Sequence, residues 1–379
     1  MIPHEIQEIL EKDPQIGRIK LANMTGISMS DARAYCMIFK RGLSDKGDKR
    51  DNNEPLFLDK KTAEKKEKPT EGKRFIDTLI RQLKSEKSII KTTPYTNPFT
   101  GKQKEDAVLL LSDIHIGRVN KFLNLNIGKT EETYNTKIFL KEAEILVHSI
   151  HHVIDLLSPT FQISKLWIFG LGDIIDNDLI FRGQRFFIDS SSGEQLWQGV
   201  KALTDIFKAL LEIFKEIEVI NVIGNHGRFT FQREASPVAN NFDYHIMKIL
   251  EVAFVNEDRI KFNLPDSWFA YPKIGNFQYL LHHGDTVYSW MALPYYGIVR
   301  KSKARRNEFP FDIETIGHFH MKMEIPLSSQ SFTLVNGGWI PKDDYSWKQY
   351  GVIVVPRQSF FGVSKKRART WSFDLTLTS

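Results

Sequence analysis

Short apolar runs recur between residues 105 and 356, and they constrain the fold more than any other feature of the sequence. They are 107–111 (AVLLL), 166–171 (LWIFGL), 219–223 (VINVI), 279–282 (YLLH), 313–316 (IETI), 332–335 (FTLV) and 351–355 (GVIVV). Runs of this length between turn residues are typical of buried strands, and longer amphipathic patterns at 138–157 and 196–217 predict helices. The sequence therefore predicts a layered α/β domain whose helices cover the faces of its sheets.

The composition is that of a soluble protein. Of 379 residues, 41% are hydrophobic and 26% are charged. No apolar run approaches the roughly 20 residues that a membrane span needs, and the N-terminal MIPHEIQEIL does not resemble a secretory signal. The single cysteine, Cys36, cannot form an intrachain disulfide, which favours a cytoplasmic protein. We expect no membrane partner and leave a homo-oligomer open, while the net charge of +6 favours an anionic partner.

Composition also divides the chain into regions. We expect a helical module over 1–43, a charged flexible linker over 44–74 and an amphipathic helix with a connector over 75–104. The catalytic domain is expected over 105–356, followed by a basic tail with a strand-like end over 357–379. The long interval between Asp113 and Asp173 predicts an insertion near 118–137.

The N-terminal module has the pattern of a helix-turn-helix. Ala22 and Gly26 are spaced as a crossing residue and a turn glycine, and Ser28 with Asp31 resembles the start of a second helix. In a DNA-binding module that second helix would present side chains to bases and phosphates. The expected contacts are Ser28, Ser30, Arg33, Lys40 and Arg41. The alternative is a small helical bundle that docks on protein or merely folds.

Polar side chains follow five of the predicted strands at their carboxyl ends. They are Asp113 and His115, then Asp173 and Asp176, then Asn225 and His226, then His283, and finally His318 and His320. Open α/β sheets place their binding sites at this edge. A mixture of carboxylate, amide and imidazole suits divalent transition ions better than an all-oxygen cage would. We expect two divalent ions, with Mn²⁺ first and Fe, Zn or Mg as alternatives.

In order, D-x-H, G-D-x-x-D, G-N-H, H-G and G-H-x-H resemble the motifs of the calcineurin-like metallophosphoesterase superfamily, over about residues 107–340. The resemblance implies a four-layer αββα sandwich of two mixed sheets, beside the N-terminal all-α module. It implies one metal ion bound by Asp113, His115, Asp173 and His320. It implies a second bound by Asp173, Asn225, His283 and His318, so that Asp173 bridges the two.

The resemblance also assigns roles beside the metal ligands. His226 would stabilise or protonate the leaving oxygen, and Asp176 would order its loop or a group behind the ligands. The family often has an acidic residue after G-N-H, whereas Gly227 and Arg228 follow here, so carboxylate support for His226 must come from elsewhere. His283 is preferred over His282 because it abuts Gly284.

Two ions about 3.5 to 4 Å apart would acidify a bridging water and clamp the phosphoryl oxygens. We therefore expect a two-metal-dependent phosphodiesterase that attacks with a metal-bridging hydroxide, resembling the DNA-repair exonuclease branch of the superfamily, with DNA as its partner. One alternative is a phosphatase or nucleotide phosphodiesterase that the N-terminal module recruits. Another is an inactive DNA-binding or scaffold protein.

Two stretches mix aromatic and basic residues, as single-stranded nucleic-acid sites do. They are TVYSWMALPYYGIVRKSKARR at 286–306 and LIFRGQRFFIDSS at 179–191. Both could equally be ordinary solvated surface or oligomer contacts. The expected substrate contacts are Arg118, Arg182, Arg185, Arg228, Tyr295, Tyr296 and Arg300.

Overall fold

The computed structural model describes residues 3–13, 16, 18–27, 31–32, 35–36, 39, 71–95, 99–232, 236–288 and 294–378. The chain divides into two compact units, residues 1–68 and 69–379. None of the helices in the described ranges is long and apolar enough to cross a membrane.

The first unit contains helices α1 (His4–Lys12) and α2 (Arg18–Thr25). Ile6, Leu10 and Leu21 are buried between them. Gly26 follows α2 with a φ of 69°, and its N–H donates to the Ala22 carbonyl at 2.8 Å, so glycine ends this helix as the sequence pattern predicts. The expected DNA contacts Ser28, Ser30, Arg33, Lys40 and Arg41 lie outside the described residues, as does most of the expected linker.

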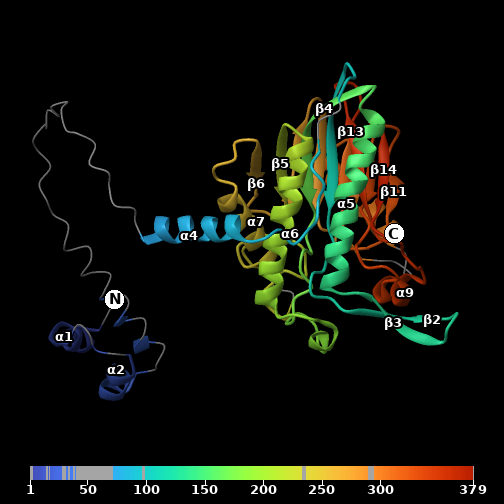
Figure 1. Cartoon of the computed structure of the whole chain (residues 1–379). Coiled ribbons are helices and arrows are strands. Elements are labelled where there is room, and N and C mark those ends of the chain that lie inside the picture. Colours follow the sequence, from blue (N-terminus) through green and yellow to red (C-terminus); the bar gives the residue numbers. More distant parts are fainter. Residues whose placement is uncertain are drawn as a thin grey trace, which may run out of the picture. The chain divides into compact units, whose positions relative to one another are not determined.

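The second unit is built around two sheets (Figure 1). The first has the order β14-β13-β1-β4-β5-β6, and its strands β1, β4, β5 and β6 run parallel. Their bounds are β1 Gln103–Leu111, β4 Phe161–Gly170, β5 Glu216–Asn221, β6 Ile260–Asn263, β13 Arg357–Val363 and β14 Ser372–Thr376.

The second sheet has the order β11-β12-β10-β9-β7, and β8 also pairs with β9. Strands β9, β10 and β12 are parallel, while the others are antiparallel to their neighbours. Their bounds are β7 Phe269–Ala270, β8 Lys273–Ile274, β9 Phe277–His282, β10 Ile313–Ile316, β11 Met323–Pro326 and β12 Phe332–Val335.

Helices cover the outer faces of both sheets, which confirms the predicted four-layer arrangement. Helices α5 (Thr136–Leu157), α6 (Ser192–Ile213) and α7 (Phe242–Ala253) pack on the first sheet, and α4 (Glu71–Ser85) contacts α7 (Figure 1). Helix α8 (Pro294–Glu308) packs on the second sheet through Ile298. The facing surfaces of the two sheets bury Leu110, Phe169 and Tyr279.

Three smaller elements surround the strand ends. A hairpin of β2 (Asn120–Asn124) and β3 (Lys129–Tyr134) occupies the expected insertion. A 3₁₀ turn, η1, spans Gln184–Phe187, and helix α9 spans Asp344–Tyr350. The side chain of Asn120 donates to the Lys342 carbonyl at 3.2 Å and so ties the hairpin to the segment before α9.

The predicted strand at 351–355 is wrong. Helix α9 ends at Tyr350, Gly351 takes a φ of 68°, and the apolar run then lies along the surface with Ile353 half exposed. The strand beside β1 is β13 instead, where Gln358 is fully buried and accepts the Ser112 N–H at 3.0 Å. The first sheet therefore continues past residue 356, where we expected the domain to end.

A buried acid on α5 gives a prediction for stability. Glu142 is 3% exposed, and its Oε2 has no hydrogen-bond partner in the described part of the chain. Burial raises the pKa of Glu142 to about 9. The folded chain thus holds a proton that the unfolded chain releases, so the contribution of Glu142 to stability is greatest below about pH 4.5 and falls as the pH rises toward 9.

Replacing Glu142 with glutamine removes this linkage. We expect the free energy of unfolding of E142Q, relative to the wild type, to rise by roughly 4 kcal/mol between pH 5 and pH 8. Chemical denaturation at the two pH values measures the difference. The variant E216Q, at the exposed start of β5, is the control and should follow the wild type. Parallel pH profiles for E142Q and the wild type would contradict the prediction.

Candidate metal centre

The loops after β1 and β4 continue the pairing of their strands. The N–H of Asp113 donates to the Gly172 carbonyl at 3.1 Å, and the N–H groups of Ile114 and His115 donate to the Asp173 carbonyl at 2.9 and 3.1 Å. These bonds place the D-x-H segment directly against Asp173. The predicted meeting of the first two motifs at one edge of the sheet therefore has a backbone cause.

The backbone around this edge is strained. Among the residues that the structure describes, seven other than glycine have a positive φ, a conformation that costs about 1–2 kcal/mol for an L-residue. Five are candidate ligands, namely Asp113, His115, Asp173, His318 and His320. Asn177 and Lys342 are the others, and both lie within a few residues of the site. Strain gathered at one place in a fold indicates a function for that place.

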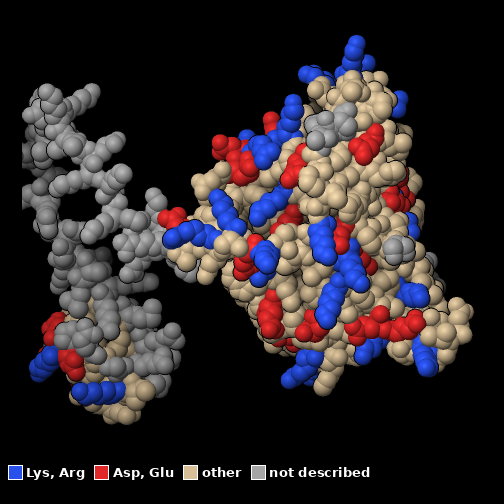
Figure 2. Space-filling model, in the orientation of Figure 1, with Lys and Arg blue, Asp and Glu red and all other residues tan. Residues whose placement is uncertain are grey.

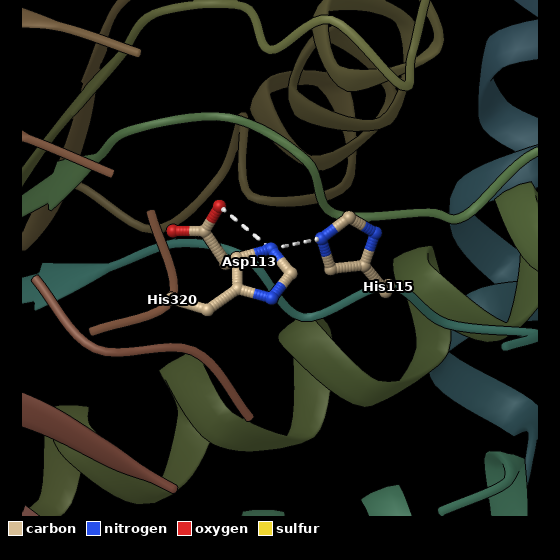
Figure 3. A group of neighbouring side chains, drawn as sticks. All are labelled: Asp113, His115 and His320. Carbon is tan, nitrogen blue, oxygen red and sulfur yellow. Dashed lines mark hydrogen bonds and ion pairs between the residues drawn. The ribbon is translucent and has the colours of Figure 1, made fainter. Parts of the chain in front are cut away.

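Asp113, His115 and His320 form the first cluster (Figure 3). The two imidazole Nε2 atoms are 3.0 Å apart, and the His320 Nε2 lies 3.6 Å from an Asp113 oxygen. All three side chains are buried. One ligand atom from each lies within 4.8 Å of the other two, close enough for a single ion.

The other nitrogen of each ring is already bonded. The Nδ1 of His115 lies 3.1 Å from the Asp176 carboxylate, and the Nδ1 of His320 lies 2.8 Å from that of Asp343. Since a carboxylate accepts, each Nδ1 carries a proton, and the two Nε2 atoms face each other. Although burial lowers the pKa of His320, the carboxylates of Asp343 and Asp113 raise it to about 9, so without a metal ion its Nε2 can also hold a proton, whereas with both rings neutral two lone pairs meet. Two lone pairs at 3.0 Å repel unless a proton or a metal cation lies between them. Carboxylate partners behind metal-binding histidines are also a common arrangement.

Asp173, His283 and His318 form the second cluster, and Asn225 adjoins it. The Nε2 of His283 is 3.0 Å from both an Asp173 oxygen and the Asn225 Oδ1. Its Nδ1 donates to the Leu171 carbonyl at 2.7 Å, so Nε2 again faces the other ligands. The same Asp173 oxygen lies 3.9 Å from His115 Nε2, which places this carboxylate between the two clusters.

Two glycines of the motifs allow these close approaches. A Cβ on Gly224 would lie 2.1 Å from an Asp173 carboxylate oxygen. A Cβ on Gly317 would lie 2.6 Å from an Asp113 oxygen. The glycines before Asn225 and His318 are therefore required by space, because any side chain there would displace a candidate ligand.

The charges favour a cation at this place. Burial would raise the pKa of Asp173, but His283 and His226 hold it well below its usual value. Burial would lower the pKa of His283, but the carboxylates of Asp173 and Asp113 raise it to about 10. The imidazole nitrogens thus lie in a strongly negative potential, where a metal ion competes with the proton.

His226 lies beside the clusters rather than in them. Its Nδ1 donates to Asp176, 2.9 Å from the carbonyl and 3.3 Å from the carboxylate, and its ring lines the adjoining pocket. Asp176 therefore supplies the support that Gly227 and Arg228 do not. Although burial lowers the pKa of His226, the charges of Asp173 and Asp176 outweigh it and raise the pKa, which favours a protonated, acidic ring.

A pocket of about 450 Å³ opens over the ligands. Its floor includes His115, Asp173, Asn225 and His318, and its sides include Arg118 and Arg182. The other expected substrate contacts, Arg185, Arg228, Tyr295, Tyr296 and Arg300, are not among the described residues that line it. Arg228 instead donates to the carbonyls of its own loop, including that of Thr230 at 3.0 Å.

The structure separates the two adjacent histidines. His283 faces Asp173, whereas the Nε2 of His282 lies 2.9 Å from the Glu314 carboxylate, away from both clusters. This follows from the alternation of side chains along β9 and the turn after it.

Sequence reasoning did not find three further residues. Asp343 binds His320 as described, and Phe181 lines the pocket. The buried carboxylate of Asp243, in the first turn of α7, accepts the N–H groups of Asp173, Ile174 and Gly224 at 2.9, 3.0 and 2.8 Å. Burial and the charge of Asp173 raise the pKa of Asp243. The sequence signal that could have indicated Asp243 is the start of a helix, with Asn241 as the N-cap and an acid in the first turn.

No family model and no curated protein matches this chain. Among solved structures, it is similar to vacuolar protein sorting 29 from Cryptosporidium parvum at 15% identity, covering 69% of this chain and 86% of that one, with a TM-score of 0.32. It is similar to a metallophosphoesterase from Sphaerobacter thermophilus at 16% identity, covering 71% and 87%, with a TM-score of 0.31. A predicted phosphoesterase from Streptococcus pneumoniae gives 10% identity, 71% and 98% coverage, and a TM-score of 0.29. Because the identities and TM-scores are this low, the comparisons assign no function to this chain. The functional proposal rests on the geometry of the site instead.

Proposed function

We propose that this chain is a phosphodiesterase that depends on two divalent metal ions and acts on DNA. The observation that carries the proposal is the pair of His115 and His320 Nε2 atoms, 3.0 Å apart, with each Nδ1 held by a carboxylate. A second set of converging donors lies next to it around Asp173. One ion would be held by Asp113, His115, Asp173 and His320, and the other by Asp173, Asn225, His283 and His318.

The residues around the ions have separate tasks. When bound, two divalent ions would supply an activated water for attack on phosphorus and offset the charge of the phosphoryl oxygens. Asp176 orients both His115 and His226 through their Nδ1 atoms. His226, with its pKa raised, would give a proton to the departing oxygen. Arg118, 3.7 Å from Asp176 and lining the pocket, would hold a phosphate oxygen of the substrate.

The donor sets suit a divalent transition ion, and we propose Mn²⁺ in both sites. Each proposed set combines imidazole nitrogens with carboxylate or amide oxygens, which suits Mn, Fe or Zn, whereas Mg²⁺ prefers oxygen donors. The only cysteine, Cys36, belongs to the N-terminal unit and is not in either cluster. The intact donor sets also favour an enzyme over an inactive scaffold.

The choice of DNA rests on local charge rather than on the whole surface. On the face shown in Figure 2, lysine and arginine side chains alternate with acidic ones, so the net charge of +6 is not gathered into one patch there. At the pocket itself, Arg118 and Arg182 stand over the ligands and would follow a phosphodiester backbone.

Removal and return of the metal tests the proposal. We expect chelated protein to be inactive and Mn²⁺ to restore hydrolysis of DNA, measured on single- and double-stranded oligonucleotides, RNA and p-nitrophenyl phosphate. Hydrolysis of the monoester alone would rule out the nuclease and leave the phosphatase. Failure to hydrolyse any of these with Mn²⁺, Fe²⁺, Zn²⁺ or Mg²⁺ would rule out the phosphoesterase.

A further inference from the structure

Two exposed phenylalanines stand at the mouth of the pocket. Phe181 is 47% exposed and Phe187 is 54% exposed, and both line the pocket with Arg118 and Arg182. Large apolar side chains that stay in water beside a charged site indicate a binding surface. Neither ring is needed to hold a metal ion or to move a proton.

The segment that carries the rings is held in place. The side chain of Gln184 is buried between them, where it donates to the Asp176 carbonyl at 2.5 Å and accepts the Phe181 N–H at 3.2 Å. The Phe187 carbonyl accepts the Val119 N–H at 2.7 Å. The backbone at Phe181 is therefore held through Gln184 to Asp176, and the backbone at Phe187 is held to Val119.

Each ring also lies beside a group of the site. The Phe181 ring centre is 5.3 Å from that of His226, the proposed acid. The Phe187 ring centre is 5.7 Å from the guanidinium carbon of Arg118. A ligand that reached both Arg118, the proposed phosphate contact, and His226, the proposed acid, would meet an aromatic ring beside each of these two residues.

We propose that Phe181 and Phe187 bind unpaired nucleobases on either side of the scissile phosphodiester, so that the site takes single-stranded nucleic acid. This inference rests on the proposed function and specifies its substrate. Aromatic side chains interleaved with arginines are the arrangement that binds single strands by base stacking and backbone charge. In a duplex both faces of each base are covered by its neighbours, so stacking on these rings requires a strand that is already open.

The dimensions of the pocket agree with this substrate. Its volume of about 450 Å³ lies within the range of about 300–1,000 Å³ that proteins use to enclose a small ligand. A nucleotide is a ligand of that size, whereas a double helix is far wider. A substrate without aromatic groups, such as a phosphorylated serine side chain, would leave both rings in water.

A pair of oligonucleotides tests the proposal without changing the protein. One is single-stranded DNA with ordinary bases, and the other carries abasic residues on both sides of the bond that is cut. We expect kcat/KM with Mn²⁺ to be higher for the first by about 5- to 150-fold for each base that stacks. A duplex of the same sequence should be cut more slowly than the single strand.

Variants identify the side chains responsible. F181A and F187A should each lose part of the preference, measured as the ratio of kcat/KM for the ordinary strand to that for the abasic strand, because each variant removes one of the two stacking contacts. F186A is the matched control, because Phe186 is 79% exposed on the same segment but is not among the described residues that line the pocket. It should keep the full preference.

Each outcome of these cleavage assays leads to a single conclusion. If the wild type cuts the ordinary and abasic strands equally, the base-binding proposal is wrong and the phosphodiesterase proposal stands. If F181A and F187A keep the preference, these rings do not bind the bases. If no strand is cut with any of the four ions, the proposed function fails, and the base-binding proposal fails with it.

Discussion

The variant D173A should lose turnover of every substrate by about 10³-fold or more, because the activated water and the charge on both ions are lost together. Asp173 lies between the two clusters, with one oxygen 3.0 Å from His283 and 3.9 Å from His115. Its other oxygen accepts a hydrogen bond from the backbone N–H of His226 at 2.7 Å. Single-turnover assays with Mn²⁺, together with metal content by mass spectrometry, measure the effect.

The control for this variant is a nearby aspartate outside the pocket. Asp178 is partly buried and accepts a hydrogen bond from the Ser192 hydroxyl. D178N should keep two ions and near wild-type turnover, and D173N should behave like D173A because an amide carries no charge. A D173A protein that retains both ions and its activity would refute the assignment of Asp173 as the shared ligand.

Loss of Asp243 should be the most damaging change away from the pocket. Its carboxylate accepts three buried N–H groups, two from the loop of Asp173 and one from Gly224. Leaving such groups without a partner costs about 1–3 kcal/mol each, so D243A should lose at least roughly 3 kcal/mol of stability. The two loops carry Asp173 and Asn225, so Mn²⁺ affinity should fall as well, as calorimetric titration would show.

Asp205 offers a matched control, because its carboxylate, like that of Asp243, accepts backbone N–H groups, in this case two. Its Oδ2 lies 2.6 Å from the Ile89 nitrogen and 3.2 Å from that of Ile90, on a connector that carries no candidate ligand. D205A should lose stability but keep the Mn²⁺ affinity of the wild type. Equal losses of affinity in D205A and D243A would show that Asp243 acts on the metal only through general stability.

The candidate ligands could be predicted because each follows a strand, and the carboxyl ends of parallel strands meet at one edge. The apolar runs predicted a layered α/β domain with covering helices, and the resemblance to metallophosphoesterases implied its two sheets. The substrate contacts were harder, since an arginine such as Arg228 can bind phosphate or its own loop, and only the path of the backbone decides. Tyr295 and Tyr296 have the composition of a binding surface and lie on α8 outside the pocket.

The residues that sequence reasoning missed act over long separations. Asp343 reaches His320 across 23 residues, and Asp243 reaches Asp173 across 70. Asp343 belongs to no short pattern, and the helix start at Asn241 and Asp243 does not show that the acid is buried, so local spacing cannot distinguish either from acids on the surface. The wrong prediction of a strand at 351–355 has a different cause, since there a local pattern was present but misleading. The apolar composition of 351–355 is local, whereas β13, the segment that pairs with β1, buries the polar Gln358, which accepts the Ser112 N–H.

The proposed ligands come from both halves of the sandwich. Asp113, His115, Asp173 and Asn225 follow strands of the first sheet, while His283, His318 and His320 follow strands of the second. Ions bound here would cross-link two layers that are joined by apolar contact and by a few buried hydrogen bonds, such as that from the Asn336 amide to the Ser112 hydroxyl at 3.0 Å. Each ion would add about 2.7 kcal/mol to the stability of the domain at a hundred times its dissociation constant. A cell depleted of the metal would then hold a protein that is both idle and more readily degraded.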